Sequence, residues 1–132
     1  MNLFGDAGFK VLERSLDLRI KRHALLTSNV ANSETPGFKA RELDFAGELE
    51  KAVGKQNESL AKTNPGHQDL ASLQASHIVF DNSGAVGNDG NNVDLDINVG
   101  KLSSNAAGYN HAVNLLTMKL RILRDAASGR GV

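Results

Sequence analysis

The sequence lacks cysteine and tryptophan, and aromatic residues make up only 5% of its 132 residues. Without cysteine, disulfide frameworks, thiol nucleophiles and cysteine-ligated zinc sites are excluded, and few rings are present to anchor a large core. No apolar run approaches the roughly 18–20 residues of a membrane helix, so direct membrane insertion is not expected. Charged residues from Asp6 to Arg14 precede any apolar stretch, which argues against a cleavable secretory signal.

The sequence also lacks a surplus of either charge, since 15 lysines and arginines balance 15 aspartates and glutamates. A protein that coats nucleic acid needs a basic surplus, so nucleic acid is not an expected partner. The charges are unevenly placed. Residues 1–32 carry five cations and three anions, residues 33–100 carry five and eleven, and residues 101–132 carry five and one. The basic ends either pack on the acidic middle of their own chain or attract neighbouring copies head to tail.

The clearest periodic pattern lies in the C-terminal segment, residues 93–132. Apolar residues and one tyrosine recur there at alternating spacings of four and three, as in a heptad seam: Leu95, Val99, Leu102, Ala106, Tyr109, Val113, Leu116, Leu120, Leu123 and Ala127. Asp94 or Asn92 is suited to cap the start of this helix, and Gly129 stands just beyond its end. The pattern predicts a helix of roughly 33 residues, about 50 Å long at 1.5 Å per residue.

A second amphipathic helix is predicted in residues 1–32, from about Asp6 to Ala31. Its apolar stripe drifts from a strict heptad toward an 11-residue repeat and comprises Phe9, Leu12, Leu16, Ile20, Ala24, Thr27 and Ala31. The stripes of the two helices either pair within one molecule or bury against other copies. Because two long helices paired alone leave much of each stripe exposed, we favour burial between molecules.

A rigid elbow is predicted where the first helix ends. Asn32 is suited to the left-handed conformation that ends helices, and Thr35 is pushed toward extended geometry by the proline that follows. Pro36 and Gly37 suit the centre of a type II turn, because proline presets φ and glycine accepts a positive φ. After the turn, Phe38 offers an apolar anchor and Lys39 an exposed cation.

The middle of the chain, residues 33–92, has weaker patterns. Residues 45–53 favour a short helix, and residues 54–76 are polar. Residues 77–80 predict a short strand that returns through Ala85 and Val86 as a small β-hairpin. We therefore predict a mainly α fold, in which long terminal helices pack as a coiled-coil-like layer around an irregular middle.

No pattern predicts a catalytic, cofactor or metal site. The four histidines are scattered without metal-ligand spacing. The segment from Asp89 to Asp96 resembles a calcium loop only faintly, because Gly90 is misplaced and no glutamate stands at the twelfth position. Its asparagines and aspartates are therefore interpreted as capping and turn residues, and an enzyme is not expected.

A resemblance to a known family rests on the elbow. The run of residues 29–40, Asn-Val-Ala-Asn-Ser-Glu-Thr-Pro-Gly-Phe-Lys-Ala, follows an amphipathic helix and strongly resembles the signature of bacterial flagellar rod and hook axial proteins. Residues 41–45, 90–96 and 109–124 resemble the short proximal-rod members in particular. Two such members share this length and layout, so both assignments stay open, beside a small helical adaptor or export chaperone.

The resemblance implies a structural role. Members of this family build the drive shaft of the flagellum, with residues such as Asn29, Ala31 and Asn32 in the assembly motif and both terminal helices in an inner tube. It implies a homo-oligomer that also contacts other rod proteins, the membrane ring protein FliF and the adaptor FliE. It further implies passage through the flagellar type III export apparatus without a cleaved signal, and a final place in the periplasmic rod.

Overall fold

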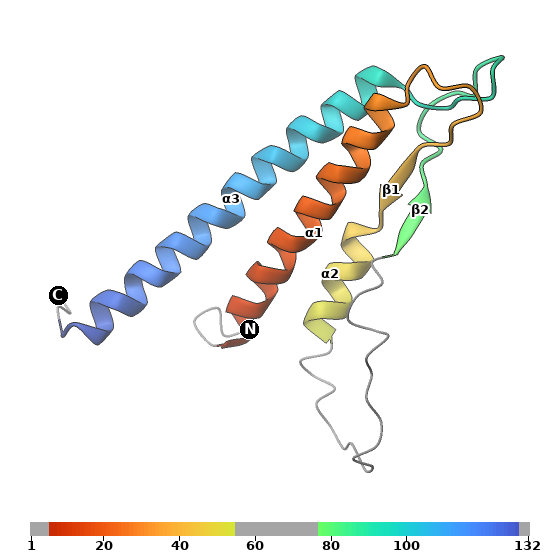
Figure 1. Ribbon diagram of the computed structural model, residues 1–132. Coiled ribbons are helices and arrows are strands. Elements are labelled where there is room, and N and C mark those ends of the chain that lie inside the picture. The colour runs from red at the N-terminus through yellow and green to blue at the C-terminus, as the bar shows by residue number, and fades with distance from the viewer. Residues whose placement is uncertain (1–5, 55–76, 130–132) are drawn as a thin grey trace, which may run out of the picture.

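The computed structural model describes residues 6–54 and 77–129. It is mainly helical, as predicted, and its elements follow the order α1 (Asp6–Ala31), β1 (Arg41–Leu43), α2 (Phe45–Gly54), β2 (Ile78–Phe80) and α3 (Leu95–Ala127). Helix α1 lies between the other two helices, and α1 and α3 run antiparallel, as Figure 1 shows. The elbow and the loop that leads into α3 gather at one end of the molecule (Figure 1).

The ends of the long helices follow local sequence signals. Asp94 is the N-cap of α3, and its carboxylate accepts a hydrogen bond from the Ile97 backbone N–H at 3.0 Å. Beyond the other end, Gly129 has a φ of 65°, the left-handed geometry that commonly follows a helix. Of the two predicted cap residues, Asp94 and not Asn92 is the N-cap, and the glycine stop and both helix spans are confirmed.

A small antiparallel sheet joins two segments that are distant in sequence. Arg41 pairs with Phe80, Glu42 with Val79 and Leu43 with Ile78. The predicted strand and small sheet are confirmed, but the predicted partner strand was wrong, because β2 pairs with β1 and not with residues 85–86. The chain after β2 is instead drawn toward the elbow, since the Asp81 N–H donates to the Ala40 carbonyl at 2.9 Å.

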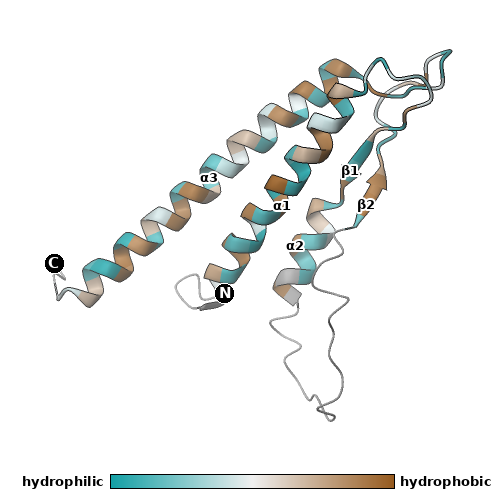
Figure 2. Ribbon diagram, viewed as in Figure 1, coloured by the Kyte–Doolittle hydropathy of each residue, from teal (hydrophilic) through white to brown (hydrophobic). Residues whose placement is uncertain are grey.

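The interior of the described chain is more polar than the sequence composition suggests. Buried apolar residues are few and comprise Leu18, Leu26, Ala40, Leu43 and Ala112. Buried polar or charged residues outnumber them and comprise Asn29, Glu48, Asp81, Asn91, Asn92, Asn98, Asn105 and Lys119. Figure 2 shows apolar residues recurring along the whole length of α3 and covering β2. Much apolar surface therefore stays on the outside of the single chain.

Candidate assembly interface

The elbow is a hydrogen-bonded turn with the predicted geometry. Gly37 has a φ of 72°, and the Phe38 N–H donates to the Thr35 carbonyl at 3.2 Å, as a type II turn centred on Pro36 and Gly37 requires. Asn32 closes the helix by donating from its side chain to the Ser28 carbonyl at 2.8 Å. The turn thus stops α1 and redirects the chain toward β1.

Asn29 ties the last turns of α1 to the first strand. Its Oδ1 accepts from the Arg41 N–H at 3.0 Å, while its Nδ2 donates to the Arg41 carbonyl at 2.8 Å. This pair of bonds copies the pattern that a neighbouring strand would offer. The same Nδ2 donates to the Asn98 Oδ1 at 3.0 Å, so one buried amide links α1, β1 and α3.

Asn91, in the loop that precedes α3, holds the elbow through its side-chain amide. Its Nδ2 donates to the carbonyls of Asn32, Ser33 and Thr35 at 2.9, 3.0 and 2.8 Å. Its Oδ1 accepts from the Val93 N–H at 2.7 Å. The sequence predicted a turn role for this segment, and the structure shows that the turn it supports is 56 or more residues earlier in the chain.

Asn92 and a pair of glycines complete this brace. Asn92 accepts from the Ala40 N–H and donates to the Asp81 carbonyl, both at 2.7 Å. Gly37 donates its N–H to the Asp89 carbonyl at 2.9 Å. A Cβ added to Gly90, whose φ is 80°, would already lie 3.6 Å from the Cα of Gly37. The loop before α3 and the elbow are therefore held as one unit.

An ionic network also links α1, β1 and α3. Both oxygens of Glu42 accept from Arg22, at 2.8 and 2.9 Å, and Lys101 lies 3.4 Å from Glu42 and also pairs with Asp81. Burial opposes ionisation of Glu42, but the hydrogen bonds from Arg22 and from the Leu43 N–H outweigh it and hold its pKa below the ordinary value. Burial likewise opposes ionisation of Asp81, but hydrogen bonds from Lys101 and Ser83 outweigh it, so the pKa of Asp81 is lowered too.

The buried positions of α3 recur every seven residues, and three of the four are polar. The buried positions of α3 are Asn98, Asn105, Ala112 and Lys119. Asn105 donates from Nδ2 to the Arg19 carbonyl at 2.8 Å, and the Lys119 ammonium lies 5.5 Å from the centre of the Phe9 ring. The apolar periodicity of the sequence did not predict these buried positions, although Asn98 and Asn105 stand seven residues apart.

Gly108 has a specific role in this contact. A Cβ placed there would overlap the guanidinium group of Arg19, whose central carbon lies 4.7 Å from the centre of the Phe45 ring of α2. Gly108 thus admits an arginine side chain that joins α1, α2 and α3.

The predicted packing stripes lie largely outside the polar seam. Ile20 is 56% exposed and Val99 51% exposed, and Leu95, Leu120 and Leu123 are also exposed. The smaller stripe residues are exposed as well: Ala24, Thr27, Ala31, Ala106 and Ala127. The remaining stripe residues are half-buried: Phe9, Leu12, Leu16, Leu102, Tyr109, Val113 and Leu116. At roughly 100° of rotation per residue, both stripes turn toward the same side of the α1–α3 pair, where Ile20 and Tyr109 line one pocket. Their burial against other chains stays a prediction.

The remaining motif residues sit at the surface of the elbow. Ala31, Thr35, Pro36 and Lys39 are exposed, and Phe38 is half-buried. Lys39 donates from Nζ to the Gly90 carbonyl at 2.6 Å. The structure explains how these residues shape the turn, while their role in assembly stays a prediction.

Neither a metal site nor a membrane-spanning helix is found among the described residues. Within residues 6–54 and 77–129, no cluster of histidine and carboxylate side chains is arranged to hold a metal ion. None of the helices seen there is long and apolar enough to cross a membrane.

Comparison with known proteins identifies the family. No protein-family model matches the chain. The chain is 33% identical over 129 residues to the flagellar basal body rod protein FlgB of Aeromonas hydrophila, covering 94% of this chain and 95% of that protein. It is 29% identical to FlgB of Salmonella typhimurium with the same coverage, and 34% identical to FlgB of Borreliella burgdorferi over 77% of this chain and 82% of that protein.

Fold and relatives together define a structural subunit of the flagellar basal body rod. Within that class, the chain belongs to the FlgB family. Because these relatives are FlgB proteins, the other short rod protein left open by the sequence, FlgC, is not favoured.

Proposed function

We propose that this chain forms part of the proximal rod, where its two long helices pack into the inner layer that transmits torque and lines the export channel. The observation that carries the proposal is the position of the apolar stripes. Both helices leave much of their stripes exposed or half-buried on one side of the α1–α3 pair, while the buried positions of α3 are three polar residues and one alanine. Burial of apolar area, at roughly 25 cal/mol per Å², is then available to join different subunits.

The braced elbow supports the same role. A shaft carries torque only if its subunits neither slip nor bend. The asparagine bonds of the elbow and the Arg22–Glu42–Lys101 network hold the turn and the start of α3 at one angle. The proposal places the subunit in the periplasmic rod after export without a cleaved signal, with copies of itself, other rod proteins, FliF and FliE as its neighbours.

The test places charged residues on the exposed apolar face. Val99→Glu combined with Leu120→Glu puts two charges on that face, and Ser103→Glu combined with Asn114→Glu puts them on exposed polar positions of the same helix. Each variant is expressed in cells whose own gene is deleted, and swimming, secretion of the chain and its amount in purified basal bodies are measured.

We expect the first variant to be secreted but absent from basal bodies, and its cells to be non-motile. The second variant should restore swimming. Normal incorporation of the Val99/Leu120 variant would show that this face is not buried in the rod and would overturn the proposal.

A further inference from the structure

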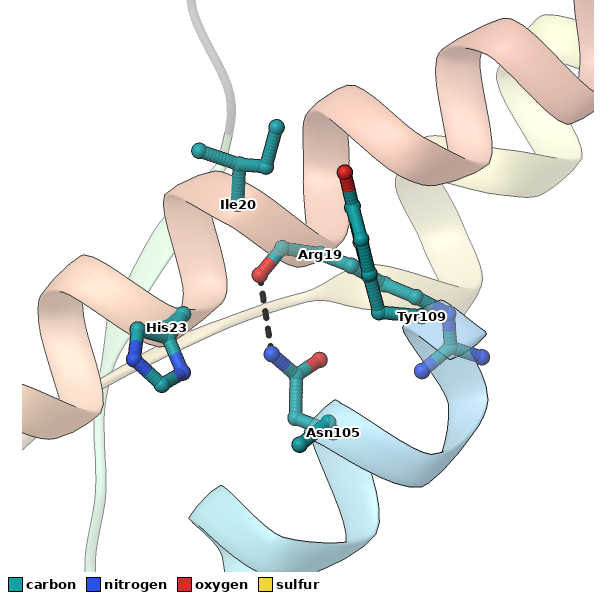
Figure 3. A pocket seen from close by; sticks show the side chains of 6 residues that line it. Arg19, Ile20, His23, Asn105 and Tyr109 are labelled. Atoms are coloured by element: carbon teal, nitrogen blue, oxygen red, sulfur yellow. Dashed lines mark hydrogen bonds between the residues drawn. The ribbon is translucent and has the colours of Figure 1, made fainter. Parts of the chain in front are cut away.

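The face of α3 opposite α1 is open along the helix. Figure 1 shows α3 at one edge of the molecule, with α1 between it and α2. In Figure 3, Asn105 points toward α1, where its Nδ2 donates to the Arg19 carbonyl. Asn105 and the positions that recur with it every seven residues are buried. At roughly 100° of rotation per residue, the positions two before and two after each of them lie on the far side of α3.

These outward positions form one row with the spacing of a coiled-coil seam. They alternate at intervals of four and three residues, and every one of them is exposed: Asp96, Gly100, Ser103, Ala107, Asn110, Asn114, Thr117, Arg121 and Arg124. We call these nine residues the outer row. An acid stands at its N-terminal end, two arginines stand at its C-terminal end, and small or uncharged polar residues fill its middle.

The charges at the two ends of the outer row are available to a partner. Among the described residues, neither Asp96 nor Arg121 has an ion-pair partner. Arg124 lies 3.5 Å from the carboxylate of its neighbour Asp125, but the Arg124 side chain is 75% exposed, and such surface pairs are weak. A second copy lying antiparallel would set arginine against aspartate at both ends. A parallel copy would set like charges against each other, which is costly.

The outer row is self-complementary when two copies run antiparallel. With a two-fold axis at Asn110, the residues before it in one copy face the residues after it in the other. Each layer then joins opposite charges, a small residue and a longer one, or two hydrogen-bonding groups: Asp96 with Arg124, Gly100 with Arg121, Ser103 with Thr117, Ala107 with Asn114, and Asn110 with Asn110 of the other copy. The charged ends attract each other, and the small residues let the two backbones approach closely.

The same pairing brings exposed apolar residues together beside the row. Val99 is 51% exposed and Leu120 is 49% exposed, and both belong to the apolar stripe on one side of α3. A two-fold axis perpendicular to the plane of the two helices keeps this side common to both copies. Val99 of one copy therefore lies beside Leu120 of the other. Burial of these side chains supplies attraction, while the charged ends fix the orientation.

We propose that two free copies of this chain pair along α3 as an antiparallel dimer, with the outer row as the contact and Asn110 at the two-fold axis. A two-fold contact uses the same surface on both copies, so it closes and does not extend. The dimer covers Val99 and Leu120, which the proposed function buries in the rod. A paired chain therefore cannot make that rod contact until the dimer separates.

The first experiment locates the axis. The chain contains no cysteine, so one introduced thiol reports on one position, and a disulfide requires two Cα atoms within about 7 Å. Asn110→Cys places both thiols at the axis, whereas Ser103→Cys places them roughly 20 Å apart at 1.5 Å per residue. We expect the purified Asn110 variant, and not the Ser103 variant, to form a disulfide-linked dimer on mild oxidation. A linked Ser103 dimer, or no linkage in the Asn110 variant, would overturn the proposal.

The second experiment exchanges the charges. Asp96→Arg sets two arginines against each other in the dimer, and Arg124→Asp sets two aspartates against each other. We expect each variant to dimerise at least tenfold more weakly in sedimentation equilibrium, because the altered layer occurs twice. A chain that carries both changes should recover the dimer. Glu13→Arg and Lys10→Asp make the same charge changes at exposed positions of α1 and should leave dimerisation unchanged.

Three results of the sedimentation experiment would overturn the proposal. The unaltered chain could stay monomeric at every concentration, its mass could grow beyond two chains, or the doubly changed chain could fail to recover the dimer. Dimerisation is measured on the free chain, and the proposed function is measured by incorporation into basal bodies. Failure of either one is therefore distinguishable from failure of the other.

Discussion

The brace formed by Asn91 allows one sharp prediction. Asn91 is 6% exposed, and its NH₂ group satisfies the carbonyls of Asn32, Ser33 and Thr35. In Asn91→Asp, an oxygen replaces that donor, so the three carbonyl oxygens lose this bond and face a carboxylate, although the Asn32 and Thr35 carbonyls keep the backbone N–H groups of Thr35 and Phe38. The bond that Oδ1 accepts from the Val93 N–H survives the change. The substitution therefore removes hydrogen bonds to the elbow while keeping the size and shape of the side chain.

The expected loss follows from the number of bonds. An NH₂ group has two protons, so its three contacts count as about two full hydrogen bonds, each worth roughly 1 kcal/mol net. The Ser33 carbonyl, which loses the bond from Asn91, and the carboxylate now facing all three oxygens add about 1–2 kcal/mol more, which brings the destabilisation to about 3–4 kcal/mol. For a chain of this length, roughly 4 °C per kcal/mol converts this to a fall in melting temperature of about 12–16 °C.

The assay is thermal and urea unfolding of the full chain, followed by circular dichroism. Asn82→Asp is the matched control, because Asn82 is exposed in the loop that follows β2 and gains the same charge. Acidification should shrink the loss in Asn91→Asp, since a protonated carboxyl regains a donor. If the free energies of unfolding of Asn91→Asp and Asn82→Asp differ by less than about 0.5 kcal/mol, the Asn91 bonds do not stabilise the elbow and the reasoning fails.

Three further predictions concern the elbow, the ionic network and the core. Pro36→Ala with Gly37→Val should let the helix run on and abolish swimming while secretion persists, because valine disfavours the positive φ of Gly37; normal swimming would contradict this. Ionised Glu42 stabilises the folded chain at pH values above 4.5, the ordinary pKa of glutamate. Because the pKa is lowered in the folded chain, this contribution is lost as the pH falls through the folded pKa. Glu42→Gln should therefore be less stable at neutral pH and less sensitive to acid in urea titrations, and an unchanged acid profile would refute the pairing. Leu18→Ala should lower the free energy of unfolding by about 2–5 kcal/mol, because Leu18 is fully buried. Ile20→Ala should lower it by less than about 1 kcal/mol, because Ile20 is half exposed. Equal losses for the two variants in urea unfolding would show that Leu18 is not part of the core.

The polar seam and the apolar outer stripes suggest how one chain serves both as a folded subunit and as a building block. Asparagines between α1 and α3 specify which residues meet, as single buried polar residues do in coiled coils, but they contribute less to stability than apolar packing would. The apolar residues are instead kept at the surface, where a neighbour is needed to bury them. Under the proposed function, the stability of the single chain and the strength of assembly rest on different faces of α3.

Much of this protein was readable from its sequence. The spans of α1 and α3, the cap at Asp94, the stop at Gly129 and the turn at Pro36–Gly37 all follow from interactions between residues within a few positions of one another. Such signals are local, so the identity of nearby residues is sufficient to predict them. The family resemblance was carried by the same local segment.

The tertiary structure alone decided the rest. The partner of β2, the three carbonyls bound by Asn91, and the choice of Asn98 and Asn105 for the inner side of α3 all join residues tens of positions apart. Three-residue strands and single asparagines carry no periodic pattern that names a distant partner. Their meeting depends on the antiparallel alignment of two long helices, and the geometry of the whole chain sets that alignment.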